Sequence, residues 1–146
     1  MIKLIITYVL IVLMVTCGCT AISDGPGTLG AVAVHELNCS ESDLGQELDR
    51  IIRAEQFKPD IIDTNIIDWW ERGGYDFLNY KCLNIQKTLY MVTVNSGNST
   101  TADISIRAFY SRKRKEWMFA REFTSAEKYN AEKAMEYLLN YISGCE

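Results

Sequence analysis

Histidine is scarce in this chain, and its scarcity excludes several kinds of enzyme. Of the 146 residues only one, His35, is a histidine. A Ser-His or Cys-His nucleophile pair would have to use this single imidazole, which has no motif around it. No Gly-x-Ser-x-Gly sequence is present either. The sequence therefore predicts no catalytic residue, although carboxylates that meet in space stay compatible with a small hydrolase.

Metal-binding and nucleic-acid-binding patterns are also missing. One histidine and dispersed cysteines do not supply the standard spacing of a zinc site. Asp60, Asp63 and Asp68 are acidic enough for calcium, but the segment lacks the glycine and the terminal glutamate of the known calcium loop. The formal net charge is −4, whereas general nucleic-acid binding requires a strongly basic surface. We predict no metal, no cofactor and no nucleic-acid partner.

Residues 1–19 have the layout of a secretory signal. Lys3 precedes an apolar run over residues 4–15, which is about 12 residues long, whereas a membrane-spanning helix needs about 20. The sequence Thr-Cys-Gly-Cys then offers small residues for processing. The segment resembles a bacterial lipoprotein signal, in which a small residue precedes a cysteine that is cleaved at its amine and acylated. Gly18 precedes Cys19, so the resemblance implies that Cys19 carries the lipid.

Three alternatives to acylation at Cys19 remain open. Thr16 stands where the lipoprotein pattern usually has an aliphatic residue, which makes Cys17 the alternative site. The others are an ordinary cleaved signal and an uncleaved anchor that continues through Ala21 and Ile22. Two acyl chains give stable membrane attachment where one gives only marginal binding. We expect an exported protein that is anchored by lipid and faces the periplasm or the cell surface.

The rest of the chain divides into a tether and one domain. Residues 20–30 are rich in glycine, serine and proline, a composition typical of a flexible spacer. Residues 31–146 are enough for a single domain with its own core. The domain contains Cys39, Cys82 and Cys145, an odd number that favours one disulfide and one thiol in an oxidising compartment.

The spacing of these cysteines suggests one pairing without deciding it. Cys39 lies just before the first predicted helix, and Cys145 lies just after the last one. A bridge between them would stabilise the fold by roughly 4–5 kcal/mol on the chain-entropy account of disulfides. A pair that involves Cys82 remains open.

Helical periodicity appears at both ends of the domain. Residues 40–57 begin with a start box at Ser40 and carry apolar residues at helical spacing. Residues 60–74 predict a short second helix that ends at two glycines, although four isoleucines argue against it. A capping box at Thr124 and Glu127 begins a C-terminal helix that Gly144 ends. Its apolar stripe consists of Ala131, Met135, Leu138 and Ile142.

Between these helices the apolar period changes to two. Four strands are predicted, and short links between them favour an antiparallel meander. An extra strand over residues 31–37 stays open. In the third strand we expect Ile104, Ile106, Ala108 and Tyr110 on one face. Grouped strands flanked by helices indicate an α+β fold with the helices packed on the sheet. The predicted strands are residues 77–82, 89–94, 104–110 and 117–123.

Two groups of residues are candidate contact surfaces. Trp, Tyr and Arg are enriched in binding hot spots, which makes Trp69, Trp70, Arg72 and Tyr75 a predicted partner-binding group. A basic tip at a predicted hairpin turn is either a contact for anionic lipid or a solvated turn that discourages edge aggregation. This basic tip consists of Arg112, Lys113, Arg114 and Lys115.

These observations favour a binding protein over an enzyme. We expect a membrane-tethered lipoprotein of the cell envelope that contacts a protein partner without catalysis. An immunity or inhibitor protein is the type that suits a small, acidic domain with aromatic surface residues. The alternative is an assembly or stress lipoprotein of a larger envelope complex, and the third hypothesis is a small hydrolase.

Overall fold

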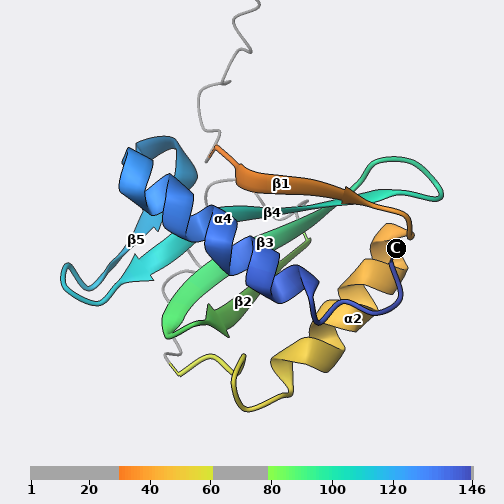
Figure 1. Ribbon diagram of the computed structural model, residues 1–146, viewed down its shortest axis with the longest axis horizontal. Helices are drawn as coiled ribbons and strands as arrows, with labels where there is room; N and C mark the ends of the chain where they lie inside the picture. Colours follow the sequence, from red (N-terminus) through yellow and green to blue (C-terminus); the bar gives the residue numbers. More distant parts are fainter. Residues whose placement is uncertain (1–29, 61–78, 146) are drawn as a thin grey trace, which may run out of the picture.

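The computed structural model describes residues 30–60 and 79–145, which form an α+β fold (Figure 1). The predicted α+β class is confirmed. The order of elements is corrected in one respect, because the first described element is a strand and the helix that follows is therefore not N-terminal. The predicted second helix at residues 60–74 lies almost wholly outside the described residues. The elements are β1 (Val32–Leu37), α2 (Glu41–Ile52), β2 (Asn79–Ile85), β3 (Thr88–Ser96), β4 (Ala102–Ser111), β5 (Glu116–Phe119), the 3-10 helix η1 (Ala120–Glu122) and α4 (Ser125–Leu139).

The strands form one antiparallel sheet in the order β1-β4-β3-β2, with β5 also paired to β4. The four strands from β2 to β5 are consecutive neighbours, as the predicted meander requires. The extra N-terminal strand exists as β1. It pairs with the first half of β4, while β5 pairs with the second half of β4. The two strands therefore share one edge of β4, as Figure 1 shows.

Both described helices begin at the predicted caps but end earlier than predicted. The Ser40 hydroxyl accepts the N–H of Asp43 at 3.1 Å, and Thr124 and Glu127 form the full capping box of α4. α2 ends at Ile52 rather than near Phe57. The chain then continues in tight turns, in which the backbone N–H groups of Ala54 and Phe57 each donate to the carbonyl three residues back. The side chain of Phe57 lies in the core and is 1% exposed. α4 likewise ends at Leu139, and Ile142 lies in the turns that follow.

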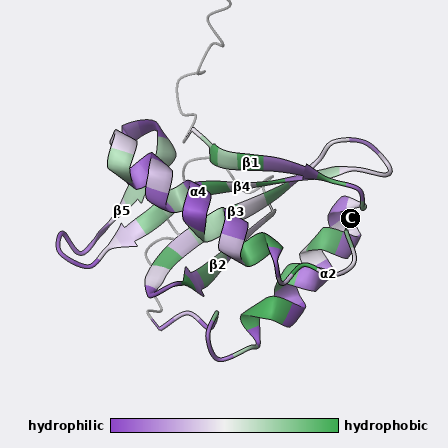
Figure 2. Cartoon of the chain, in the orientation of Figure 1, coloured by the Kyte–Doolittle hydropathy of each residue, from purple (hydrophilic) through white to green (hydrophobic). Residues whose placement is uncertain are grey.

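One hydrophobic core fills the space between the sheet and the two helices. Leu44, Leu48 and Ile51 of α2 pack against the same face of the sheet as Met135 and Leu138 of α4. Figure 2 shows hydrophobic and hydrophilic residues alternating along both helices, as expected for helices with one buried side. Among the described residues, no helix is long and apolar enough to cross a bilayer. The sheet contributes Leu83, Ile85, Tyr90, Val92, Val94, Ala102, Ile104 and Ile106 to this core.

A bulge in β4 corrects the predicted face of that strand. Met91 pairs with Ala108, but the next residue of β3, Val92, pairs with Ile106, so β4 contains one extra residue. An extra residue reverses the alternation of side chains beyond it. Ile104 and Ile106 therefore face the helices, whereas Ala108 is buried with Met91 in a second apolar cluster. The prediction that these side chains share one face along the whole strand is therefore wrong beyond Ile106.

The last predicted strand is also shorter than expected. β5 ends at Phe119, and the chain turns through η1 before α4. Phe123, predicted as the end of the strand, lies after η1 and is 6% exposed. Its ring packs against that of Phe109 at 5.1 Å between centroids. The residues predicted as one strand thus divide between a strand and a turn that closes one end of the core.

Candidate functional site

The residues predicted for lipidation and for partner contact lie outside the described residues. This applies to Cys17 and Cys19 in the predicted signal and to the group of Trp69, Trp70, Arg72 and Tyr75. Their roles stay predictions. The basic tip and the three cysteines of the domain are described.

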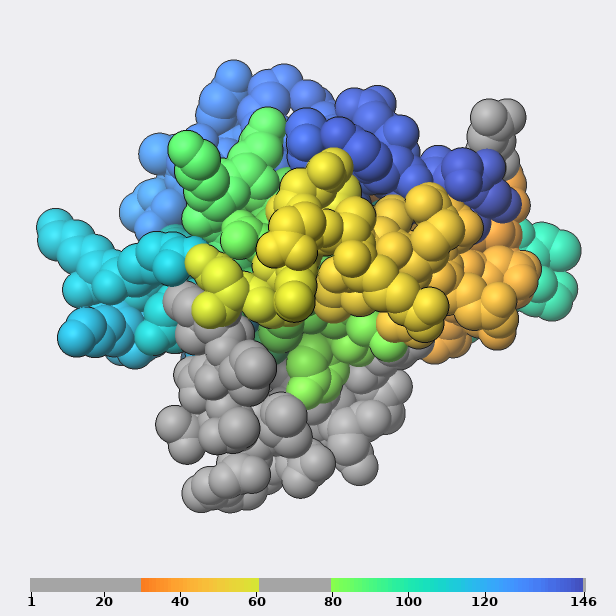
Figure 3. All heavy atoms as spheres, turned by 90° about the horizontal axis from the view of Figure 1, so that it is seen from below, coloured from red at the N-terminus to blue at the C-terminus, as the bar shows by residue number. Residues whose placement is uncertain are grey.

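The basic tip occupies the turn between β4 and β5. All four side chains are exposed, and the turn projects at one end of the molecule, in cyan in Figure 3. Arg112 forms an ion pair with Asp60, and Arg114 lies 3.9 Å from the Glu116 carboxylate. Among the described residues Lys113 and Lys115 form no ion pair. Within the described parts of the chain, the tip thus presents two ammonium groups without an ion pair beside two partly neutralised guanidinium groups.

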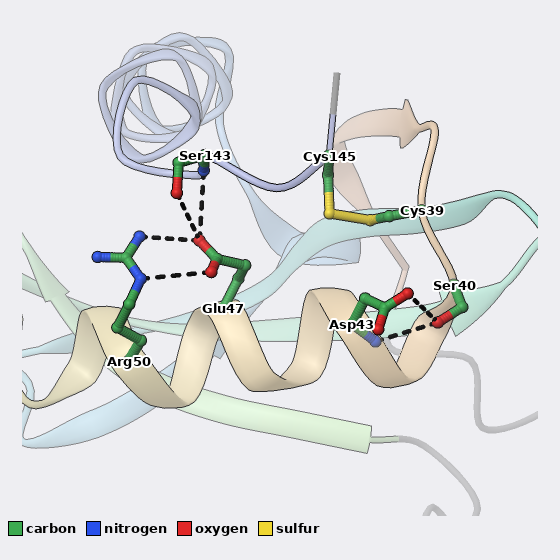
Figure 4. The surroundings of a disulfide bond; sticks show 7 residues. All are labelled: Cys39, Ser40, Asp43, Glu47, Arg50, Ser143 and Cys145. Atoms are coloured by element: carbon green, nitrogen blue, oxygen red, sulfur yellow. Dashed lines mark hydrogen bonds and ion pairs between the residues drawn. A yellow bond between two sulfur atoms is a disulfide. The ribbon is translucent and has the colours of Figure 1, made fainter.

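Cys39 and Cys145 form the disulfide, and Cys82 is a free thiol. The bridge joins the turn before α2 to the segment after α4, across a sequence separation of 106 residues (Figure 4). Cys82 lies on β2, where burial raises the pKa of its thiol to about 11. Burial favours the neutral thiol over the thiolate, which is the nucleophilic form.

A second connection between α2 and the C-terminal segment lies beside the disulfide. The Glu47 carboxylate accepts hydrogen bonds from the Arg50 guanidinium at 2.8 and 3.3 Å. It also accepts the backbone N–H and the hydroxyl of Ser143, each at 3.3 Å, as Figure 4 shows. Arg50 in turn donates to the carbonyl of Tyr141 at 2.8 Å. The disulfide and this network hold the segment after α4 against α2.

Three tyrosines and one lysine follow one another at four-residue intervals along α4 and the turn after it. Tyr129, Lys133, Tyr137 and Tyr141, here called the tyrosine stripe, follow one another at the spacing of helical neighbours. Tyr129 is 63% exposed and Tyr141 is 37% exposed. The Lys133 ammonium lies 5.8 Å from the centre of the Tyr129 ring and 2.7 Å from a Glu136 carboxylate oxygen. The stripe thus consists of two exposed rings, one half-buried ring and one cation.

Packing fixes the C-terminal end of the stripe. The rings of Tyr137 and Tyr141 lie 5.2 Å apart, and both contact the ring of Phe57. Their hydroxyls are hydrogen-bonded at 3.0 Å, and this bond raises the pKa of Tyr137. The Arg50 guanidinium also holds the backbone of Tyr141 through its hydrogen bond to the Tyr141 carbonyl. These contacts hold the Tyr137 and Tyr141 rings in place.

A pocket of about 400 Å³ opens beside the stripe, between α4 and the β2–β3 hairpin. Tyr90 and Phe109 contribute aromatic rings, and Glu127 and Lys133 contribute charged groups. Lys133 belongs to both the pocket and the stripe, so the two form one continuous surface. This aromatic pocket is lined by Ile85, Gln86, Thr88, Tyr90, Phe109, Glu127, Asn130 and Lys133.

Sequence reasoning missed both the stripe and the pocket. The four-residue spacing of the stripe is a local signal in the sequence, next to the apolar stripe of the same helix. The pocket had no local signal, because β2, β3, β4 and α4 each contribute residues to it. Only the packing of these elements brings the residues together.

Among the described residues, the one histidine and several carboxylates outside the pocket lie in separate ion pairs. His35 Nε2 lies 4.0 Å from a carboxylate oxygen of Glu132, on an exposed edge of the sheet. In the described parts of the chain, no three histidine, cysteine, aspartate or glutamate side chains are placed to share a metal ion. No family of known proteins, no curated protein and no solved structure matches the chain.

Proposed function

We propose that this chain is an exported lipoprotein domain that binds a protein partner in the cell envelope through its tyrosine stripe. The observation that carries the proposal is the tyrosine stripe, in which Tyr129 and Tyr141 are exposed and the Tyr137 and Tyr141 rings are held by packing and a hydrogen bond. Tyrosine supplies a large contact area at a small cost in side-chain entropy and is enriched in binding hot spots. The tyrosine stripe lies on a domain that a disulfide closes, which suits export to an oxidising compartment.

Within this class, the proposal is an immunity or inhibitor protein that covers one target enzyme. The alternative is an assembly or stress lipoprotein, which would join several partners. Stoichiometry separates them, since an inhibitor forms one tight complex and an assembly factor is recovered with a larger set. Trp69, Trp70, Arg72 and Tyr75 remain a second proposed contact group.

The test of partner binding is affinity purification of the full-length protein from its native envelope. The key variant is Tyr129→Ala, which removes the most exposed ring of the stripe without touching the core. Lys128→Ala is the matched control, because Lys128 is the exposed neighbour on the same helix outside the stripe. We expect the wild type and the control to retain a stoichiometric partner. The amount of partner recovered with Tyr129→Ala should be at least tenfold lower. Equal recovery with Tyr129→Ala would contradict the proposed face, and Trp69→Ala/Trp70→Ala then tests the second group.

The proposed anchor has a separate test. Cys19→Ala should release the protein from the membrane fraction and remove an acyl-sized mass, because two acyl chains supply the stable attachment. Cys17→Ala serves as the control, since Cys17 is the alternative site. Membrane retention in the Cys19 variant together with release in the Cys17 variant would move the anchor to Cys17. Retention in both would disprove a lipid anchor at either position.

The basic tip is proposed as an auxiliary contact with anionic lipid. Each Lys or Arg close to such a surface contributes about 1 kcal/mol, and Lys113 and Lys115 are the two cations of the basic tip that form no ion pair with another described residue. Lys113→Glu/Lys115→Glu should therefore weaken binding of the Cys19→Ala protein to anionic vesicles, and salt should weaken it further. Binding that is unaffected by either change would make the tip a solvated turn.

A further inference from the structure

The floor of the aromatic pocket is rigid and apolar. Ile85 is fully buried and Tyr90 is 5% exposed. The Tyr90 and Phe109 rings are tilted by 59° with their centres 6.4 Å apart, and Phe109 packs on Phe123 behind it. The volume of about 400 Å³ lies within the range of roughly 300–1,000 Å³ that is common for ligand pockets. Tilted rings of this kind favour a further ring packed edge to face or offset on them.

The rim of the pocket carries hydrogen-bond acceptors in fixed positions. Glu127 Oε2 accepts both the backbone N–H and the hydroxyl of Thr124, at 2.7 and 2.9 Å. The capping box therefore fixes the carboxylate while its other oxygen, Oε1, takes no part in these bonds. Gln86 and Asn130 add carboxamide groups to the lining.

The positive charge of Lys133 disfavours a cationic side chain in the pocket. Lys133 lines the pocket, and its ammonium group donates to a Glu136 carboxylate oxygen at 2.7 Å and lies 5.8 Å from the centre of the Tyr129 ring. An arginine or lysine entering from a partner would meet this like charge. The lining carries one carboxylate and one ammonium group, so a neutral occupant matches it best.

We infer that this pocket is the anchor point of the partner and takes a tryptophan or tyrosine side chain from it. The ring packs on Tyr90 and Phe109, and its N–H or O–H donates to the free oxygen of Glu127 or to a neighbouring carboxamide. A leucine or isoleucine would leave these acceptors without a donor. The inference rests on the proposed function, because the side chain comes from the bound protein.

The first test uses N-acetyl-tryptophanamide as the probe and saturation-transfer NMR on the full-length protein. Asn130→Trp places a large side chain at the opening, and Lys128→Trp is the matched control on the same helix outside the pocket. We expect the probe to bind the wild type and the control, and to bind Asn130→Trp at least tenfold more weakly. N-acetyl-leucinamide should also bind at least tenfold more weakly. No binding of the tryptophan probe, or equal binding to Asn130→Trp, would overturn the inference.

Glu127→Gln provides a second variant that preserves the fold. Glutamine also completes a capping box, so the helix start is retained while the carboxylate is lost. The probe should bind severalfold more weakly to this variant, whose thermal unfolding should be close to that of the wild type. Unchanged affinity would remove Glu127 from the recognition of the donor and overturn that part of the inference.

Partner capture separates a failure of this inference from a failure of the proposed function. Loss of the partner in both Tyr129→Ala and Asn130→Trp, with retention in Lys128→Trp, supports the pocket as an anchor. Loss in Tyr129→Ala alone leaves the proposed binding face standing and overturns the pocket as its anchor. Retention in both variants overturns the binding face itself, and a probe that still binds then identifies a site for free aromatic molecules.

Discussion

At the scale of single residues, Glu47 shows how one carboxylate connects two distant parts of the chain. The Arg50 guanidinium and then the Ser143 backbone N–H lower its pKa from 4.5 to about 2. Both groups stabilise the ionised carboxylate, and Ser143 lies beyond the end of α4. The connection is therefore a tertiary contact whose strength depends on pH.

This contact predicts a loss of stability in acid. Because the pKa of Glu47 is lower in the folded state, its contribution is complete above pH 4.5 and declines as the pH falls toward 2. After allowance for screening by solvent, the contribution is about 1 kcal/mol. Urea unfolding of the wild type and Glu47→Gln at pH 7 and pH 3 measures it. The two proteins should differ at pH 7 and approach each other at pH 3; a constant difference would refute the assignment.

Cys82 predicts a second behaviour at the residue scale. Burial raises the pKa of its thiol from 9.0 to about 11, so the thiolate fraction at pH 8 is about a hundredfold lower than that of an ordinary cysteine. The thiolate of higher pKa is the stronger nucleophile, which offsets part of this difference, so a thiol reagent should react with Cys82 about tenfold more slowly in the folded protein than in urea. The Cys82→Ser variant provides the background rate from other cysteines. Equal rates in the two states would show that the thiol is not protected.

At the scale of elements, the β2–β3 hairpin contains backbone strain at a turn whose residues do not predict this turn type. Gln86 and Lys87 form its two-residue turn with φ angles of +50° and +71°. Such a turn matches the twist of the strands, but residues other than Gly, Asn and Asp adopt it at a cost. The hairpin forms because Leu83, Ile85 and Tyr90 bury their side chains in the core on either side of the turn.

Relief of this strain should stabilise the protein. Gln86→Asn/Lys87→Gly supplies the residues that a turn of this type prefers, and we expect a gain of about 1 kcal/mol in the free energy of unfolding. Thermal or urea unfolding measures the gain. The matched control is Lys58→Gly, an exposed position outside the turn, which should not stabilise. A loss of stability in the double variant would mean that the turn depends on contacts of the Gln86 or Lys87 side chains.

At the scale of the whole molecule, the fold is closed by joining its two ends. Cys39 precedes α2 and Cys145 follows α4, so their bridge encloses both described helices and most of the sheet. Closing so long a loop lowers the conformational entropy of the unfolded chain. On the chain-entropy account this stabilises the folded state by about 4–5 kcal/mol. Residues near the two sulfurs, including Glu47 and Ser143, add polar contacts to the same closure.

Removal of the bridge should therefore be the most costly of these changes. We expect Cys39→Ser/Cys145→Ser to lose about 4 kcal/mol in the free energy of unfolding, measured by urea denaturation. Reduction of the wild type should give a similar loss, while Cys82→Ser should retain most of its stability. A loss under 1 kcal/mol would show that the core and the Glu47 network suffice to close the fold.

The sequence by itself determined the elements whose signals are local. Ser40 and Thr124 cap helices through atoms only three residues away, and the period of two along the strands follows from the geometry of the backbone itself. It also predicted the meander, because links this short permit only antiparallel neighbours. The cellular location of the protein remains a sequence-based prediction, since the segment that resembles a lipoprotein signal lies outside the described residues.

Only the tertiary structure decided what depends on distant partners. The bulge that turns Ala108 away from Ile106 is defined against β3, and the choice of Cys145 as the partner of Cys39 requires the last segment to return to α2. The proposed binding surface is of the same kind, since Tyr90, Phe109 and Glu127 belong to three different elements. Local sequence reports the preferences of neighbouring residues, whereas packing selects which remote side chains share one pocket.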